Sequence, residues 1–444
     1  MNFQGVLGHE FVGTVIQVYQ EDGVSSFSYL VHQRVCGEIN LPCKTCSVCC
    51  IRDDQETVQE EDKRTTTTRR RQDAILARNH CPRRTVLGIL NKQGTMAQYL
   101  TLPISNLHVV PSRIPDPIAV FAEPLAAALR IVEQNLIVFP FQLLASDSTS
   151  TPTMTRTVAI AATTGITSTP SKVAILGDGK LGLMIAHVLG RIFLQHLLYP
   201  YFFSSSTEHQ PFLSSLSTTT TSEILTRSET TTTNFARTVN ETKCYLKNLA
   251  TKYSWIETHK PTLIGKHVEK LNLLKNPFVD ADNNDDGDSN DKNSSSSSSL
   301  IHTVLLSECM DVTTWNGVSL QYSSQFDVVI DATGSPSGLT LASKLCKPLG
   351  TLVLKTTCAT GSAFNTAPFV IDELHVVGSR CGPIDQALDF LNTYYETDPP
   401  VPQKEEKEDD LLNLPMTLRK LAPFYVDRLI HGIYPIKVRC LYHP

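Results

Sequence analysis

The sequence predicts an α/β protein made of a β-rich domain followed by a domain built on a doubly wound parallel sheet. A cluster of cysteines in the first part indicates a metal lobe, and a glycine-rich turn separates an apolar strand, VAILG, from an apolar helix, LGLMIAHVLGRIFL. The later runs FDVVIDATGS, LGTLVLKTT and ELHVVGSR alternate with helix-length segments, which is typical of parallel strands in an α/β sheet.

The size and charge of the chain limit the classes of function. With 444 residues it can form two or three domains, and its net charge of −5 does not favour nucleic acid as a partner. The first residues match neither a signal peptide nor a transit peptide, and the longest apolar run, LIVFPFQLLA, is too short to cross a bilayer. We therefore expect a cytoplasmic protein with no membrane partner.

Polar segments of low complexity interrupt the chain and suggest where the domains end. They are rich in charged residues, Ser, Thr or Asp, and cannot bury enough apolar surface to fold. Four segments have this composition: about 51–78, 146–170, 195–258 and 277–300. Three intervals are the expected domains: 1–134 for the first, 172–360 for the second, and 361–444 for the end of the second and the return to the first.

The segment LPCKTCSVCC places Cys43, Cys46 and Cys49 at a Cys-x2-Cys-x2-Cys spacing. This spacing lets successive thiolates converge on one tetrahedral ion, and four sulfurs leave no open position, so the pattern predicts a structural zinc. A long segment before the fourth ligand adds only a logarithmic entropy cost. A cysteine-rich loop without metal is the alternative. The fourth ligand is expected to be Cys81, with His80 and Cys50 as the other candidates.

The glycine-rich turn carries Gly177, Gly179 and Gly182 as G-x-G-x-x-G between strand and helix, the context of a dinucleotide-binding loop. The acid expected about 20 residues further on, for the ribose hydroxyl, is missing. The second strand is expected at PTLIGKH, where Lys266 and His267 stand in its place. A cation there favours the 2′-phosphate of NADP over NAD, unless Lys266 only starts the next turn.

The order of these motifs resembles that of the zinc-containing medium-chain alcohol dehydrogenases, most of all the branch with sorbitol, threonine and glucose dehydrogenases. The resemblance covers residue 3 to about residue 436, apart from the low-complexity segments. It implies a GroES-like catalytic domain and a Rossmann nucleotide-binding domain. Five stretches carry it: GVLGHEFVGTV, RVCGEINLPCKTCSVC, NHCPRRTVLGILNKQGTMAQYLTLP, AVFAEPLAAALRI and the glycine-rich turn.

The resemblance also implies roles for particular residues. His9, its neighbour Glu10, and Glu123 in AEPLAAAL match the catalytic-zinc site, and so are the expected catalytic residues. Taken alone, Glu123 would be an ordinary first-turn residue of a helix and His9 a core histidine. The other matches are Cys43, Cys46, Cys49 and Cys81 in the structural-zinc lobe, and Thr333 and Gly334, with residues 378–382, in loops that line the cofactor.

The implied activity is hydride transfer between an alcohol or carbonyl substrate and NAD or NADP, by a zinc-dependent dehydrogenase that forms homo-oligomers. In the family a zinc-binding cysteine precedes Gly-His-Glu, so we expect this sequence to be clipped at both ends and its turnover to be weak. Two alternatives are an NAD(P)-binding relic with only the structural zinc, and a zinc-ribbon interaction module with residues 69–71 as its basic arm. The acidic net charge argues against nucleic acid for the second.

Overall fold

The computed structural model divides into two compact units, which are described separately. Unit 1 comprises Met1–Arg130, Arg380–Glu406 and Asn413–Pro444, and unit 2 comprises Ile131–Ser379 and Lys407–Leu412. Most of the low-complexity sequence, together with Cys50 and the arginines 69–71, lies outside the residues that the structure describes. The described residues are 3–19, 27–49, 78–139, 170–203, 255–274, 301–357, 365–393 and 436–441.

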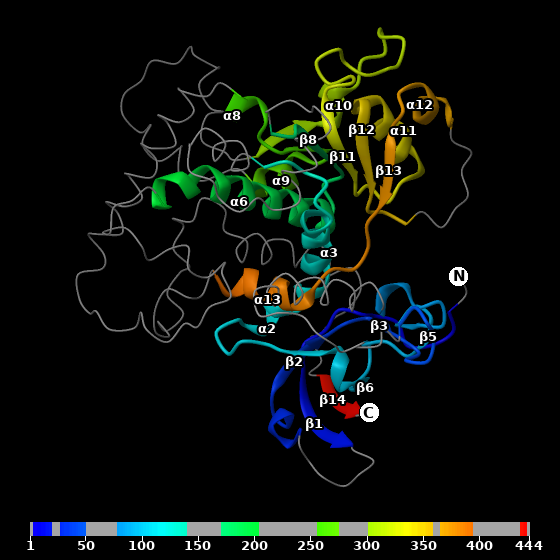
Figure 1. The fold of residues 1–444 in the computed structure, drawn as a ribbon, viewed down its shortest axis with the longest axis vertical. Coiled ribbons are helices and arrows are strands. Elements are labelled where there is room, and N and C mark those ends of the chain that lie inside the picture. The colour runs from blue at the N-terminus through cyan, green and yellow to red at the C-terminus, as the bar shows by residue number, and fades with distance from the viewer. Residues whose placement is uncertain are drawn as a thin grey trace, which may run out of the picture. The chain divides into compact units, whose positions relative to one another are not determined.

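Unit 2 is built on a six-stranded parallel sheet (Figure 1). The chain starts in the middle of the sheet at β8, builds outward on one side through β9 and β10, then returns to the other side through β11, β12 and β13. This is the doubly wound arrangement expected from the sequence. In spatial order the strands are β10 (His302–Leu305), β9 (Thr262–Gly265), β8 (Val173–Leu176), β11 (Phe326–Asp331), β12 (Cys346–Leu354) and β13 (His375–Gly378).

The predicted strands of unit 2 are confirmed because their composition suits burial on both faces. All four residues of β8 and all four of β9 are buried, as central parallel strands require. Strand β10 was not predicted, because it has only the four residues HTVL and alternates poorly. The helix after β8 continues to Phe203, beyond its predicted end at Leu194. The helices of unit 2 are α6 (Lys180–Phe203), α8 (Trp255–Thr258), α9 (Val268–Leu271), η5 (Asn272–Leu274), α10 (Leu306–Cys309), α11 (Pro336–Leu345) and α12 (Ala367–Ile371).

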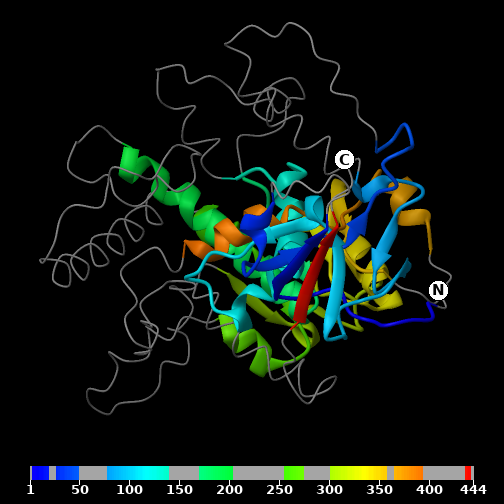
Figure 2. The ribbon, with the colours of Figure 1, turned by 90° about the horizontal axis from the view of Figure 1, so that it is seen from below.

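Unit 1 is rich in short strands arranged in two sheets. In its larger sheet β14 pairs in parallel with both β1 and β6, although it lies far from them in the sequence, and Figure 2 shows β14 in red between these two strands. The five strands are, in spatial order, β6 (Tyr99–Pro103), β14 (Ile436–Leu441), β1 (Gly13–Tyr19), β2 (Arg34–Gly37) and β7 (Leu107–Val109). The smaller sheet contains β3 (Asn40–Leu41), β4 (Thr85–Leu87) and β5 (Asn91–Lys92).

An apolar cluster joins the two sheets of unit 1. Val15 and Val35 from the larger sheet and Leu87 from the smaller one are fully buried in it.

Among the helices that the structure describes in either unit, none combines the length and apolar character that a membrane span requires. The helices of unit 1 are η1 (Ser28–Leu30), η3 (Ile104–Asn106), α2 (Asp116–Ala119), the first turns of α3 (Ala122–Glu133), and α13 (Ile384–Asn392).

Candidate functional site

Four cysteine sulfurs come together in unit 1. The Sγ atoms of Cys43, Cys46, Cys49 and Cys81 all lie within 4.8 Å of one another. The separations are 3.3 Å between Cys46 and Cys49, 3.6 Å between Cys43 and Cys49, and 3.7 Å between Cys46 and Cys81. A zinc ion with Zn–S bonds of about 2.3 Å needs sulfurs roughly 3.8 Å apart at the corners of its tetrahedron. The four sulfurs therefore fit a closed zinc shell.

The loop after β3 turns the first three sulfurs toward the fourth. The N–H of Cys49 bonds to the carbonyl of Cys46, and the N–H of Cys43 donates to Sγ of Cys81 at 3.4 Å. A hydrogen bond from the Thr45 hydroxyl lowers the pKa of the Cys43 thiol to about 5, whereas burial raises the pKa of Cys81 to about 11. A cation between the sulfurs would favour the thiolate of Cys81 as well.

Two other residues, His80 and Cys50, were candidates for the fourth zinc ligand. His80 is exposed, although it precedes Cys81 directly, and it is not part of the four-ligand group. Cys50 lies outside the described residues. The geometry thus favours Cys81 as the fourth ligand.

A second group of metal-type ligands lies in the same unit. One ligand atom each from His9, Glu10 and Glu123 lies within 4.8 Å of the others, and all three residues are half-buried. One imidazole and two carboxylates are hard or borderline ligands that suit zinc, and three of them leave a tetrahedral position open. The structure therefore brings together the three residues that the resemblance selects.

Glycines hold the chain close beside His9. Gly8 has a φ of +93°, and a Cβ at this residue would lie 2.6 Å from the Thr95 hydroxyl. A Cβ at Gly88 or Gly94 would approach the carbonyl oxygen of Gly8 to 2.2 or 2.3 Å. The Thr95 N–H donates to that same carbonyl at 2.9 Å. These close approaches fix the backbone from which His9 projects, and side chains at the glycines would move it.

Glu123 reaches the cluster from the first turn of α3. Its position just before Pro124 suits a helix start, because proline fits the first turn and a carboxylate is favoured at the positive end of the helix dipole. Burial, followed by the charge of Glu123, raises the pKa of the nearby Cys381 thiol. Glu123 therefore suits the start of α3 and also lies beside His9 and Glu10. Its role at the helix start does not account for its position beside these two residues.

The glycine-rich turn of unit 2 depends on backbone contacts. Gly177 has a φ of +104°, and a Cβ there would lie 2.8 Å from the carbonyl oxygen of Ala332. A Cβ at Gly182 would lie 1.8 Å from the carbonyl oxygen of Gly177. Gly179 precedes α6 directly, and its carbonyl accepts the N–H of Leu183. The three glycines thus form a tight strand–turn–helix joint at the carboxyl end of β8.

The loop after β11 lies beside this turn. Thr333 donates both its N–H and its hydroxyl to Oδ1 of Asp331, and Gly334, with a φ of +68°, donates its N–H to the hydroxyl of Thr356. Because β8 and β11 are neighbours from the two halves of the sheet, these loops meet where open α/β sheets bind ligands. Lys266 and His267 follow β9 at the same edge.

The next loop that the resemblance selects, residues 378–382, starts at this edge and leaves it. The hydroxyl of Ser379 accepts a hydrogen bond from the buried Lys355 at 3.0 Å in unit 2. Arg380 belongs to unit 1, where it donates to the carbonyl of Asn79 at 3.0 Å and to Oδ1 of Asn40 at 2.9 Å. Only the first residues of this loop therefore remain at the edge of the parallel sheet.

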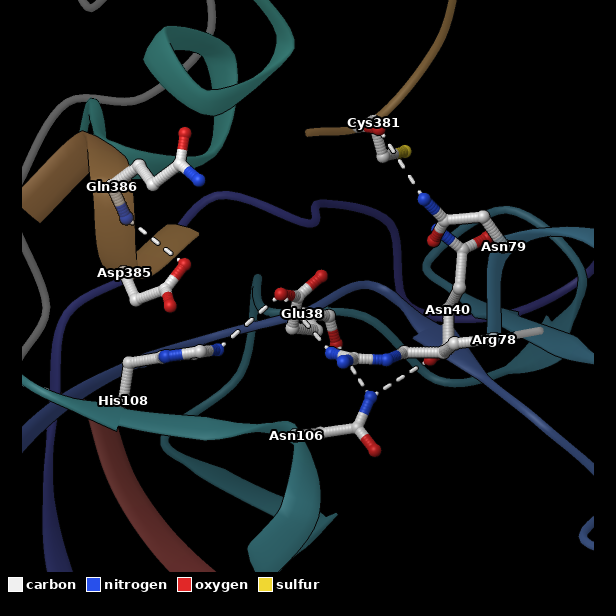
Figure 3. A network of polar contacts seen from close by, with 9 residues as sticks. All are labelled: Glu38, Asn40, Arg78, Asn79, Asn106, His108, Cys381, Asp385 and Gln386. Atoms are coloured by element: carbon white, nitrogen blue, oxygen red, sulfur yellow. Dashed lines mark hydrogen bonds and ion pairs between the residues drawn. The ribbon is translucent and has the colours of Figure 1, made fainter. Parts of the chain in front are cut away.

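A buried polar network in unit 1 was not expected from the sequence (Figure 3). Glu38 is only 4% exposed, and its Oε1 lies 3.0 Å from Nη1 of Arg78 and 3.3 Å from Nε2 of His108. The Asn106 side chain donates to the carbonyls of Glu38 and Asn40 at 3.1 and 2.8 Å. The available signal was a charged residue, Glu38, directly after the buried strand β2.

Comparison with known sequences supports the resemblance of the first unit to the alcohol dehydrogenases. A family model described as the alcohol dehydrogenase GroES-like domain matches residues 1–112. L-threonine 3-dehydrogenase of Edwardsiella ictaluri is 25% identical over 193 residues, which are 44% of this chain and 39% of that protein. The enzyme of the same name from Chelativorans sp. is 30% identical over 124 residues, or 28% of each chain. The chain thus spans well under half the length of these relatives.

The solved structures that align with the chain are more distant in sequence. Galactitol-1-phosphate dehydrogenase from Escherichia coli is 15% identical with a TM-score of 0.45, and the match covers 88% of this chain and 74% of that one. An NADH complex of a protein described as a short chain alcohol dehydrogenase, rspB, from E. coli CFT073 is 15% identical with a TM-score of 0.49, and the match covers 97% of this chain and 82% of that one. The domain match places residues 1–112 in the family of alcohol dehydrogenase GroES-like domains, and the sequence relatives of the chain carry the names of dehydrogenases.

Proposed function

We propose that this protein is a zinc-dependent dehydrogenase that transfers a hydride between an alcohol or carbonyl substrate and NAD or NADP. The observation that carries the proposal is the convergence of His9, Glu10 and Glu123 in unit 1. Glu123 is far from the other two in the sequence, and neither the helix dipole nor core packing requires it to meet an imidazole. A ligand set with an open position is what a catalytic metal site needs.

In this proposal His9, Glu10 and Glu123 hold the catalytic zinc. A zinc ion bound there supplies Lewis acidity, which polarises a carbonyl oxygen or stabilises the oxygen of an alcohol. The protein positions the ligands through Gly8, whose carbonyl is held by the N–H of Thr95 and enclosed by Gly88 and Gly94. Rigid placement of the ligands matters because small errors in ligand position weaken both affinity and catalysis.

The four cysteines have a separate role in the proposal. Their sulfurs complete a tetrahedral shell, so a zinc bound there has no position for substrate and acts structurally. The ion would join the loop after β3 to Cys81 just before β4, and both strands belong to the three-stranded sheet. None of residues 43–49 in the cysteine loop is buried, so metal ligation would stabilise a segment that has no apolar core of its own.

The edge formed by the glycine-rich turn and the Thr333–Gly334 loop is the proposed dinucleotide site. NAD or NADP supplies the hydride chemistry when bound, and the protein contributes orientation. Gly179 and the start of α6 offer close backbone approach to the pyrophosphate, since an N-terminal end of a long helix favours an anion. Thr333 and Gly334 lie at the end of β11, in the half of the sheet that holds the nicotinamide side in doubly wound folds.

The substrate is proposed only as a class. The sequence relatives are named for L-threonine, an alcohol with an amino acid backbone, and the chain covers only part of their length. We extend to this chain the general class of small alcohols and carbonyl compounds. The cytoplasmic location expected from the sequence and the homo-oligomeric state implied by the resemblance belong to the same proposal.

The test is the zinc content per chain, measured by elemental mass spectrometry alongside a turnover screen. We expect about two zinc ions in the wild type, about one in the Cys43→Ser/Cys46→Ser variant, and about one in the His9→Ala/Glu123→Ala variant. Glu133→Ala, at the other end of α3, is the matched control and should keep both ions. The screen combines NAD and NADP with L-threonine, polyols and simple alcohols.

The two readouts separate the proposal from its rival. The dehydrogenase is supported if the wild type reduces NAD or NADP in the presence of a substrate, and if the His9→Ala/Glu123→Ala variant loses both this activity and one zinc ion. One zinc that disappears with the cysteines, together with dinucleotide binding and no turnover, would instead identify a binding relic with a structural zinc.

A further inference from the structure

The second strand of the nucleotide-binding unit ends without the expected acid. In βαβ dinucleotide sites an acidic residue at this strand end accepts the adenosine ribose 2′-hydroxyl and disfavours a 2′-phosphate. Here β9 ends at Gly265 and is followed by Lys266 and His267. By sequence this arrangement favours NADP.

A carboxylate reaches this strand end from the glycine-rich turn instead. Asp178 lies between Gly177 and Gly179, and its Oδ2 accepts three hydrogen bonds from the residues after β9. The donors are the N–H of Lys266 at 2.7 Å, the N–H of His267 at 2.6 Å and Nδ1 of the His267 ring at 2.9 Å. A neutral ring with its proton on Nδ1 is sufficient for the third bond.

The carboxylate is fixed rather than mobile. The Asp178 side chain is 9% exposed, compared with 48% for His267. A Cβ at Gly265 would lie 2.7 to 2.9 Å from Cβ, Cγ and Oδ2 of Asp178, so a glycine at the strand end makes room for the acid. All three bonds end on Oδ2, and within the described part of the chain no donor contacts Oδ1.

From this contact we propose that Asp178 selects the unphosphorylated adenosine ribose, so that the protein binds NADH in preference to NADPH. The inference rests on the proposed function, because it needs a dinucleotide in unit 2. Asp178 supplies from the glycine-rich turn the charge that the end of β9 lacks. Its free oxygen suits a ribose hydroxyl as donor, whereas a 2′-phosphate would meet both a fixed negative charge and N–H groups already in use.

Lys266 does not reverse this preference. Its side chain is exposed, so its charge is solvated and screened, and ordering it on a phosphate would lose side-chain entropy. The Asp178 carboxylate is buried and held by three donors, so its field is stronger at the ribose and needs no reorganisation. A fixed buried anion therefore outweighs a mobile exposed cation.

The experiment compares dissociation constants for NADH and NADPH by titration of the reduced nicotinamide fluorescence. It uses the full chain and needs no turnover. We expect the wild type to bind NADH at least about tenfold more tightly than NADPH, and Asp178→Asn to reduce that ratio by about tenfold or more, since Asn keeps the shape and removes the charge. Glu269→Gln removes an equal charge from an exposed position two residues beyond His267, and should leave the ratio within about twofold.

The possible results distinguish a failure of the role of Asp178 from a failure of the proposed function. A wild type that prefers NADPH, or an Asp178→Asn ratio equal to that of the wild type, overturns the role of Asp178 and leaves the proposed function standing. Binding of neither dinucleotide removes the proposed function itself. Should Asp178→Asn fail to fold, Gly265→Ala offers a second route, since its Cβ must displace the carboxylate and should shift the ratio in the same direction.

Discussion

Units 1 and 2 form their candidate sites in opposite ways. In unit 1 the side chains themselves converge, four sulfurs in one group and an imidazole with two carboxylates in the other. In unit 2 most of the candidate residues are glycines, and the loops approach one another because no side chain stands between them. A site made of side chains fails when ligand atoms are removed, whereas a site made of backbone fails when atoms are added. Each of the following changes tests one side of this difference.

The largest effect is expected from removing one sulfur of unit 1. Cys46→Ser replaces a ligand whose Sγ lies 3.3 Å from Cys49 and 3.7 Å from Cys81, so zinc should be lost and the lobe destabilised by at least about 5 kcal/mol. Hydrogen exchange should rise in β3 and β4 and stay unchanged in the sheet of unit 2. Val48→Ala, at an exposed position in the same loop, is the control. Unchanged exchange in Cys46→Ser would show that the lobe folds without metal.

A single added methyl group tests unit 2. Gly182→Ala would place a Cβ 1.8 Å from the carbonyl oxygen of Gly177, so the turn must open or α6 must move away from β8. We expect a loss of about 3 kcal/mol in the free energy of unfolding and loss of dinucleotide binding, measured by urea denaturation and by NADH titration. Val370→Ala is the control, because this side chain in α12 is 75% exposed and lies outside the loops of the proposed dinucleotide site. Equal binding by both variants would contradict a site made of backbone.

These contrasts also explain what could be predicted from the sequence. The cysteine spacing and the glycine pattern are local, so their chemistry is readable within a short stretch of chain. His9 and Glu123 are distant in the sequence, and only the resemblance to a known family paired them. The parallel strands were recognisable because burial on both faces requires continuous apolar runs such as VAIL and TLIG.

The missed features depend on contacts between distant segments. Asp178 looks like a variable position of the glycine motif, and nothing in its neighbours indicates that it bonds to residues 266 and 267. The partners of Glu38 come from separate parts of unit 1 for the same reason. Strand β10 was missed because four residues with partial burial give no periodic signal.

The apolar interior of unit 2 should make its stability sensitive to acid. Burial lowers the pKa of His196 in α6 to about 4, and its ring stacks on Phe139 with centroids 5.0 Å apart. The unfolded chain takes up the proton near pH 6.5 and the folded chain only near pH 4, so stability is complete above pH 6.5 and falls between these values. The loss should reach up to about 3 kcal/mol, and His196→Phe should remove it in urea titrations at several pH values.

The control for this pH dependence is an exposed histidine of the same unit. His375 in β13 is exposed, so His375→Phe should keep the wild-type slope of stability against pH. A slope that persists in His196→Phe would mean that other groups of unit 2 control its acid sensitivity.

The smallest effect on stability is expected at the buried Glu38 of unit 1, whose partners are side chains and not a metal. Glu38→Gln keeps the shape of the buried residue but removes the charge that faces Arg78 and His108, leaving a largely buried guanidinium without its counter-ion. We expect a loss of about 2 kcal/mol in the free energy of unfolding, with zinc content unchanged. Asp116→Asn is the control, since its ion pair with Arg34 is far more exposed and should contribute less than about 1 kcal/mol. If both variants lost the same stability, burial would not distinguish the two ion pairs. A larger loss in Glu38→Gln alone would show that convergent side chains stabilise unit 1 even where no metal is involved.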